Sequence, residues 1–207
     1  CTPHCHRIVA DLFANSAGDR AIRLARLLAY FGDPAGVPAL VDTLAGVEAW
    51  DSRILQGKMA EYAHLPTPVD SLVLALGWTR DERGLPQILR MTRLLDASVT
   101  LSHHRAVALA AERIGAPDAC ADLRDLLCKP GMRGHTQTRI VPLHDKPPEN
   151  RRRTEALREL VLARALYRCG DSQGVAAAIL RDYCDDLRSL LRRHARAVLG
   201  IEGEPKS

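Results

Sequence analysis

Six residues with chemically versatile side chains lie at the expected ends of helices or in the loops beside them. They are Trp50, Asp51, Asp70, His103, Arg105 and His135. A pair of histidines with a carboxylate can bind a ligand, transfer protons or hold a metal ion. If equivalent helix ends line up along one edge of the molecule, these residues converge although they are far apart in sequence. We therefore take them as candidates for a ligand site or a domain interface, and we assign no catalytic residue.

The same residues also fit a purely structural role. The segment Thr67–Asp70 has the form of a capping box, with Asp70 at the third helical position. Ser102 is a natural N-cap residue, which places His103 and His104 in the first turn of the next helix. There both histidines can satisfy loop carbonyl groups. The structural and the ligand-binding interpretations both stay open at this point.

The opening residues carry a second group with metal-binding side chains. Cys1, Cys5 and His6 form a Cys-x-x-x-Cys-His spacing, which resembles a rare variant of covalent haem attachment. The density of Cys and His also suits zinc, but zinc sites need a second pair of ligands at a defined spacing. The sequence shows no such pair. These three residues are therefore weak candidates, and we expect no metal site.

Motifs of complete active sites are missing from the sequence. It contains no Gly-x-Ser-x-Gly, no His-Glu-x-x-His and no Walker-type loop. We therefore expect no complete active site within these 207 residues. No run of 18 apolar residues occurs either, so no membrane span is expected.

The charge distribution does not favour nucleic-acid binding. The chain carries a net charge of +4, but most arginines alternate with acidic residues, as in Arg80–Arg83. A nucleic-acid-binding surface should instead concentrate its cations on one face. Aromatic residues, on which bases stack, make up only 4% of the chain. We therefore expect partners other than nucleic acid.

One pattern recurs four times: a helix ends at a glycine or polar turn, and a second helix then opens with small residues. The copies are Phe31–Leu40, Thr79–Ile88, Ile114–Leu123 and Cys169–Ala178. Their equivalent positions Asp33, Asp81, Ala116 and Asp171 are separated by 48, 35 and 55 residues. The shortest step matches one bare helical hairpin, and the longer steps add inserted loops.

Local chemistry agrees with this repeat. Three glycines can adopt the left-handed conformation that ends a helix, and they are Gly32, Gly115 and Gly170. Asp33 and Asp171 can cap the helix that follows. A further set of small residues marks positions where neighbouring helices would cross closely, namely Gly36, Gly84, Ala119 and Gly174.

The expected fold is all-α, a solenoid of about four helical hairpins with a C-terminal capping helix. First helices are predicted over residues 20–32, 68–79, 102–115 and 153–169. Their partners are predicted over residues 34–46, 82–95, 117–128 and 172–184, and the capping helix over 185–199. The repeat domain thus spans 20–199, with inserted loops at 47–66 and 129–152. Residues 1–19 are expected to continue from an upstream domain, and residues 200–207 form a tail.

The turn pattern resembles the phycobilisome-lyase type of HEAT-like repeat. A more specific resemblance is to the helical C-terminal region of bacterial FAD-dependent oxidoreductase-like proteins, some labelled xanthan lyase. It rests on Trp50-Asp51, Thr67–Gly77, Ser102–Ala110, Pro130–His135 and Leu157–Asp171. This resemblance implies a flavin-binding domain upstream. The chain itself has no G-x-G-x-x-G motif, so any flavin chemistry is expected to belong to that domain.

Two functions follow as expectations. In the first, the chain is the scaffold or docking domain of an FAD-dependent oxidoreductase, and FAD binds outside this chain. In the second, it is a free-standing interaction module that binds another protein. The sequence predicts no cellular location.

Overall fold

The computed structural model describes residues 3–51, 65–140 and 149–201. Within these ranges every regular element is a helix, so the predicted all-α class is confirmed. The α-helices are α1 (Pro3–Ala14), α2 (Gly18–Tyr30), α3 (Val37–Ala45), α4 (Pro68–Thr79), α5 (Leu85–Arg93), α6 (Leu101–Ile114), α7 (Ala119–Cys128), α8 (Glu149–Gly170), α9 (Val175–Tyr183) and α10 (Ser189–Leu199). Short 3₁₀ helices η1 (Pro34–Gly36) and η3 (Glu82–Gly84) precede α3 and α5.

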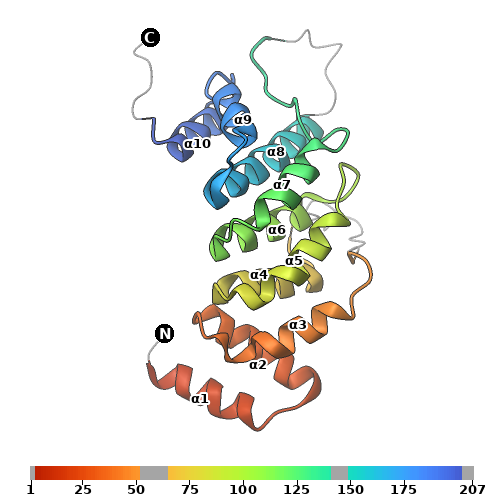
Figure 1. Ribbon diagram of the computed structural model, residues 1–207, viewed down its shortest axis with the longest axis vertical. Coiled ribbons are helices and arrows are strands. Elements are labelled where there is room, and N and C mark those ends of the chain that lie inside the picture. The colour runs from red at the N-terminus through yellow and green to blue at the C-terminus, as the bar shows by residue number, and fades with distance from the viewer. Residues whose placement is uncertain (1–2, 52–64, 141–148, 202–207) are drawn as a thin grey trace.

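The helices are arranged along one long axis, from α1 at one end to α9 and α10 at the other (Figure 1). Helices α2, α4, α6 and α8 each pack against the next one in this series. Helices α3, α5 and α7 lie beside them, and each contacts its neighbour in sequence order. The buried core is made mainly of Leu, Ala and Val side chains, and it runs continuously through the array.

The predicted turn chemistry is present at the helix ends. Gly32, Gly115 and Gly170 have φ values of 76°, 72° and 101°, which is the left-handed region that glycine adopts without strain. The Asp33 carboxylate accepts a hydrogen bond from the Ala35 amide at 2.8 Å. The Asp171 carboxylate accepts one from the Ala176 amide at 2.7 Å. These local predictions are therefore confirmed.

Small residues allow close approach between helices at specific points. A Cβ atom added to Gly36 would lie 2.6 Å from the Ala25 Cβ, and one added to Gly77 would lie 2.4 Å from the Ala110 Cα. A Cβ atom added to Gly84 would lie 3.2 Å from side-chain atoms of Leu76, which is also closer than an ordinary contact. The prediction for Gly174 is wrong, because it has a φ of 71° and a side chain there would meet nothing within 4 Å. Gly174 instead forms the N-cap position of α9.

Basic side chains bind the C-terminal carbonyl groups of the preceding hairpin. The Arg90 guanidinium donates to the carbonyl oxygens of Leu44 and Val47 at 2.6 and 2.9 Å. The Lys129 ammonium donates to those of Arg93 and Leu95 at 2.8 and 2.6 Å. These carbonyls lie at or just beyond the C-terminal ends of α3 and α5, where the helix dipole concentrates partial negative charge. Each cation therefore stabilises a helix end and joins two successive hairpins.

Three elements differ most from the sequence-based boundaries. The helix α1 lies inside the predicted N-terminal segment 1–19. Helix α8 begins at residue 149 instead of 153. The capping helix α10 begins at Ser189 instead of 185, because a turn at Asp186 occupies the intervening residues. Of the two predicted loops, residues 47–51, 65–66, 129–140 and 149–152 lie within the described part of the chain, and 149–152 belong to α8.

Arg80 provides a test of the turn chemistry. It occupies the position equivalent to Gly32, Gly115 and Gly170, and it has a left-handed φ of 56°. This conformation costs a residue with a Cβ about 1–2 kcal/mol. We expect Arg80→Gly to stabilise the protein by about 1 kcal/mol, measured by urea unfolding. The reciprocal change Gly115→Arg should destabilise it by a similar amount, and a destabilising Arg80→Gly would contradict the assignment.

Candidate functional site

Asp70 and His103 form a buried pair between the first turns of α4 and α6. The His103 Nδ1 lies 2.7 Å from the Asp70 Oδ1. The Asp70 side chain is fully buried and the His103 side chain is 3% exposed. The second oxygen of Asp70 accepts a hydrogen bond from the Thr67 amide at 2.9 Å. The Thr67 hydroxyl in turn accepts one from the Asp70 amide, so the predicted capping box is present.

Trp50 and Asp51 complete this group from the segment that follows α3. The Trp50 ring stacks on the His103 ring with centroids 4.6 Å apart, and its Nε1 donates to the Met91 carbonyl oxygen at 3.0 Å. The Asp51 carboxylate accepts hydrogen bonds from the Thr67 hydroxyl at 2.5 Å and from the Val69 amide at 3.3 Å. We call Trp50, Asp51, Thr67, Asp70 and His103 the junction cluster. It contains four of the six candidate residues.

The expected convergence does not extend to Arg105. Successive residues of an α-helix are rotated by about 100°, so Arg105 projects about 200° away from His103. Its exposed side chain lines a groove between α6, α8 and α10. Arg105 therefore belongs to a different surface from the junction cluster.

His135 also lies elsewhere, in the loop that follows α7. Its Nε2 is 3.0 Å from the Gly131 carbonyl oxygen, and its Nδ1 is 3.7 Å from the Glu155 carboxylate. Its backbone amide donates to Glu159 at 2.9 Å. The ring thus mainly satisfies its own loop and the start of α8.

Glu159 is one of two buried carboxylates that shape this loop and that sequence reasoning missed. It is 2% exposed and accepts hydrogen bonds from the amides of Gly134 and His135 at 3.0 and 2.9 Å. It also accepts one from the Tyr183 hydroxyl at 2.9 Å. Burial and the neighbouring Glu159 charge raise the pKa of Tyr183 well above its usual value. Nothing in the sequence around Glu159 marks it as buried, because it looks like any acidic residue on the solvent-exposed face of a helix.

Asp186 holds the same loop from the other side. Its buried carboxylate accepts a hydrogen bond from the Gln137 amide at 2.9 Å and from the Arg188 guanidinium at 2.8 and 2.6 Å. Burial alone would raise the pKa of Asp186, but these donors outweigh it and hold the pKa below its usual value. Arg188 also donates to the His135 carbonyl oxygen at 2.7 Å. The path of the loop is therefore set by contacts with α8 and the α9–α10 turn.

The chemistry available to the junction cluster follows from its hydrogen bonds. Because a carboxylate can only accept a hydrogen bond, the contact with Asp70 places a proton on the His103 Nδ1. The remaining groups of the cluster are used in capping α4 and in anchoring Trp50. Because the cluster ties the start of α4, the start of α6 and residues 50–51 together, its arrangement fits a structural junction.

The weak metal candidates near the N-terminus do not form a site among the described residues. Cys1 lies outside the described residues, and Cys5 is exposed on α1. The His6 Nε2 lies 2.6 Å from the Asp33 carboxylate, which joins α1 to the turn after α2. Across residues 3–51, 65–140 and 149–201, no three Cys, His, Asp or Glu side chains come together in a way that could hold a metal ion.

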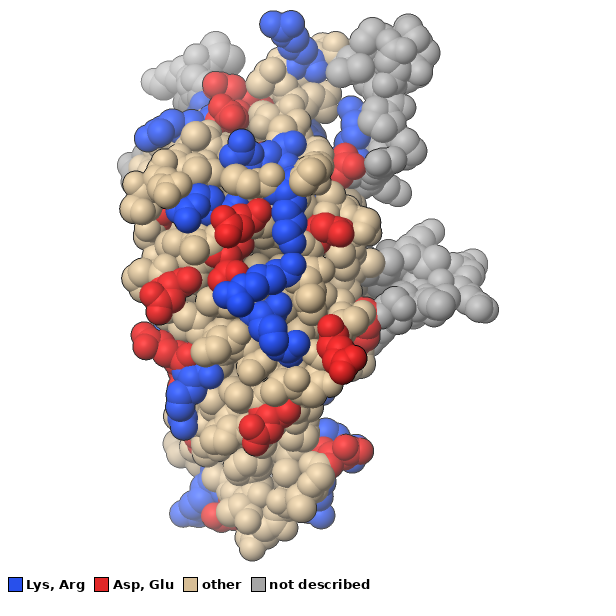
Figure 2. Space-filling view, turned by 45° about the vertical axis from the view of Figure 1, so that its right-hand side comes forward, with Lys and Arg blue, Asp and Glu red and all other residues tan. Residues whose placement is uncertain are grey.

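Two surface properties bear on possible partners. None of the helices in the described ranges is both long and apolar enough to cross a membrane. Lys and Arg side chains form a band along one face, and Asp and Glu side chains border this band on both sides (Figure 2). The charges on this face are therefore mixed.

His104 is fully buried next to the junction cluster. Its Nδ1 lies 3.0 Å from the Thr100 carbonyl oxygen, and its Nε2 lies 3.0 Å from the Asp96 carbonyl oxygen. Burial disfavours the charged ring and is the largest cause of a lowered pKa. The two carbonyl acceptors favour the protonated ring but do not offset burial, and the nearby charge of Arg158 lowers the pKa further. The pKa of His104 is lowered from 6.5 to about 4.

No protein-family model, curated protein or solved structure matches this chain.

The Asp70–His103 pair predicts strong coupling between two helices. The buried Asp70 carboxylate accepts hydrogen bonds from both His103 and the Thr67 amide, and an asparagine has only one oxygen to accept them, so Asp70→Asn should lower the free energy of unfolding by about 3 kcal/mol. His103→Gln should cost about 2 kcal/mol, and the double variant should show a coupling energy of about 1–3 kcal/mol in a double-mutant cycle. Asp19→Asn, at an exposed first-turn acid of α2, serves as the control and should change stability by less than about 0.5 kcal/mol. Additive effects would contradict the pairing.

The lowered pKa of His104 predicts a pH dependence of stability. Its folded-state pKa of about 4 lies below the usual 6.5, so the unfolded chain binds a proton that the folded chain does not. The contribution to stability is therefore complete above about pH 6.5, and it falls by up to about 1.4 kcal/mol per pH unit as the pH drops towards 4. His104→Gln should unfold with a shallower pH dependence over this range. Equal slopes in urea unfolding of both proteins would contradict the prediction.

Proposed function

We propose that this chain is a HEAT-like α-solenoid that serves as a scaffold for docking another protein domain. The recurring hairpins support this proposal, because each buries its apolar face against the next. So do the cations Arg90 and Lys129, which join one hairpin to the helix end of the one before. Stacked repeats of this kind provide extended binding surfaces.

Helix α1 is the single observation that carries the docking proposal. It packs against α2 and buries none of its own residues. Ile8 and Leu12 are four residues apart and therefore share one face, and they are 44% and 41% exposed. Terminal repeats of a solenoid need a polar outer face to stay soluble. The open apolar face of α1 therefore fits a surface that another domain covers.

The proposed occupant is a flavin-binding domain of the same parent polypeptide, as the resemblance of the loop motifs implies. In this arrangement FAD binds in that domain, and the helical array holds it in position. The proposal assigns α1 as the main docking element and assigns no catalytic residue to this chain.

A second candidate function is a free-standing module that binds another protein. A row of side chains on three successive first helices favours it. Tyr30, which is 60% exposed, contacts Trp78 with ring centroids 4.6 Å apart, and the Arg113 guanidinium lies 4.4 Å from the centre of the Trp78 ring. Tyr, Trp and Arg are the residues that most often dominate binding energy at protein interfaces.

The test uses the complete parent protein, obtained from the full reading frame. Its visible absorption spectrum should show bound flavin. Ile8→Arg combined with Leu12→Arg should weaken the docking of the separately expressed flavin domain by at least about tenfold, measured by calorimetry, because two apolar contacts are replaced by charges. The melting temperature of the helical array should change little, because both residues are exposed.

Ala14→Arg is the matched control, because it adds a charge to the same helix on a different face. It should leave docking within about twofold of the unmodified protein. A parent protein without flavin would overturn the proposal. If a protein partner then lost affinity on Trp78→Ala, the second candidate function would replace it.

A further inference from the structure

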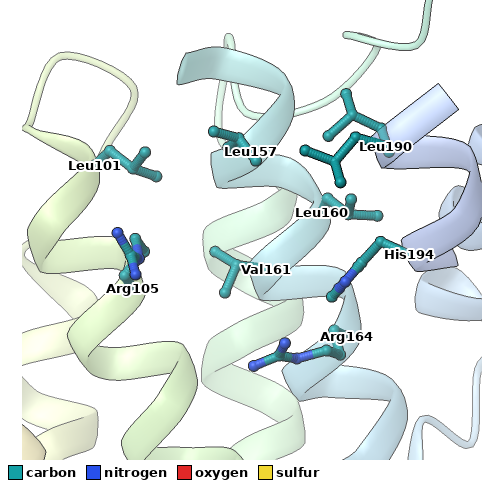
Figure 3. A pocket seen from close by; sticks show the side chains of 9 residues that line it. Leu101, Arg105, Leu157, Leu160, Val161, Arg164, Leu190 and His194 are labelled. Carbon is teal, nitrogen blue, oxygen red and sulfur yellow. The ribbon is translucent and has the colours of Figure 1, made fainter. Parts of the chain in front are cut away.

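A groove between α6, α8 and α10 combines apolar walls with cationic side chains (Figure 3). It encloses about 360 Å³, which lies within the range of small-molecule binding sites, roughly 300–1,000 Å³. Leu157 and Leu160 of α8 and Leu190 of α10 form much of its apolar wall. Leu190 is 60% exposed, so this part of the wall is open to solvent.

The polar side of the groove consists of Arg105 from α6, Arg164 from α8 and His194 from α10. The Nε of Arg164 donates to the Glu112 carboxylate at 2.7 Å, which fixes the orientation of its guanidinium. Arg105, in contrast, makes no hydrogen bond or ion pair with any residue that the structure describes. The groove therefore holds one guanidinium that Glu112 orients and one that has no partner among the described residues.

His194 adds a neutral hydrogen-bonding group to this side. Burial lowers its pKa, and the charges of Arg164 and Arg168 lower it further, whereas Glu112 opposes them. The ring therefore favours the neutral form, which can both donate and accept a hydrogen bond. The groove thus offers a carboxylate the unoccupied guanidinium of Arg105 on its α6 side, with Arg164, which Glu112 orients, and the imidazole of His194 elsewhere in its lining.

The two sides are separated along the groove. In Figure 3 the labelled leucines lie towards the N-terminal end of α8, and Arg105, Arg164 and His194 lie towards its C-terminal end. This polarity matches a ligand with an apolar body and an anionic head. Arginine pairs with carboxylates through two parallel hydrogen bonds, which gives such a site both affinity and orientation.

We propose that this groove binds a small carboxylic acid with an apolar chain. Its carboxylate pairs with Arg105, with Arg164 and His194 beside it, and its chain packs against Leu157, Leu160 and Leu190. This site is independent of the docking surface on α1, and it lies on the opposite side of α6 from the junction cluster.

The test measures binding of octanoate and octanamide to the whole chain by isothermal titration calorimetry. The two compounds have the same chain length and differ in the charge of the head group. We expect octanoate to bind at least tenfold more tightly than octanamide. Arg105→Gln should weaken the binding of octanoate by about tenfold, which corresponds to about 1.4 kcal/mol. It should leave the affinity for octanamide unchanged. Because Arg105 is exposed, its substitution should preserve the circular dichroism spectrum and melting temperature.

Arg113→Gln is the control, because it removes another exposed arginine from α6 that lies outside the groove. It should leave the affinity for octanoate unchanged. Equal affinities for octanoate and octanamide, no binding of either compound, or octanoate binding that does not respond to Arg105→Gln would each overturn the proposal. So would tighter binding, through Arg105, of a leucine- and glutamate-containing peptide amide, since that result would assign the groove to a protein partner.

Discussion

The buried carboxylate of Asp70 is the interaction on which the middle of the array depends. A buried charge is costly unless hydrogen-bonded, and here His103 and the Thr67 amide supply the donors. Seven residues further along α4, Gly77 packs against Ala110 of α6. Asp70 pairs with His103 and Gly77 meets Ala110 at the same offset of 33 residues. Two contacts about two turns apart therefore fix the register of the helices. The Gly77–Ala110 contact requires glycine, because any Cβ atom at Gly77 would clash with Ala110. The Asp70–His103 contact requires a buried carboxylate whose hydrogen bonds are satisfied.

Sequence reasoning succeeded where the controlling interactions are local. Helix-ending glycines, aspartate caps and the capping box depend on residues within one or two turns, so Gly32, Asp33 and Asp70 were recognisable. It failed for Arg105 because alignment of helix ends says nothing about the direction of a side chain two positions further on. It failed for His135 because Glu159 sets the path of its loop from 24 residues away. Such a partner has no sequence signature.

The structure separates roles that the sequence had merged into one site. The junction cluster connects helices and is almost closed to solvent, whereas Arg105 faces an open groove with a different chemical character. The open apolar face of α1 is a third feature, at the far end of the array. The proposed scaffold function draws on both kinds of region, because a rigid interior positions the surfaces that bind. Cations such as Arg90 contribute to that rigidity by stabilising the helix ends of the preceding hairpin.

Native-state hydrogen exchange at the Thr67 amide tests most directly whether Asp70 anchors the array. This amide donates to the buried carboxylate, so we expect it to exchange only when the whole helical array unfolds. Its opening free energy should then equal the free energy of global unfolding measured by urea. An opening free energy several kcal/mol below the global value would contradict this role of Asp70. It would show that the start of α4 opens on its own, with the rest of the array held together by other contacts.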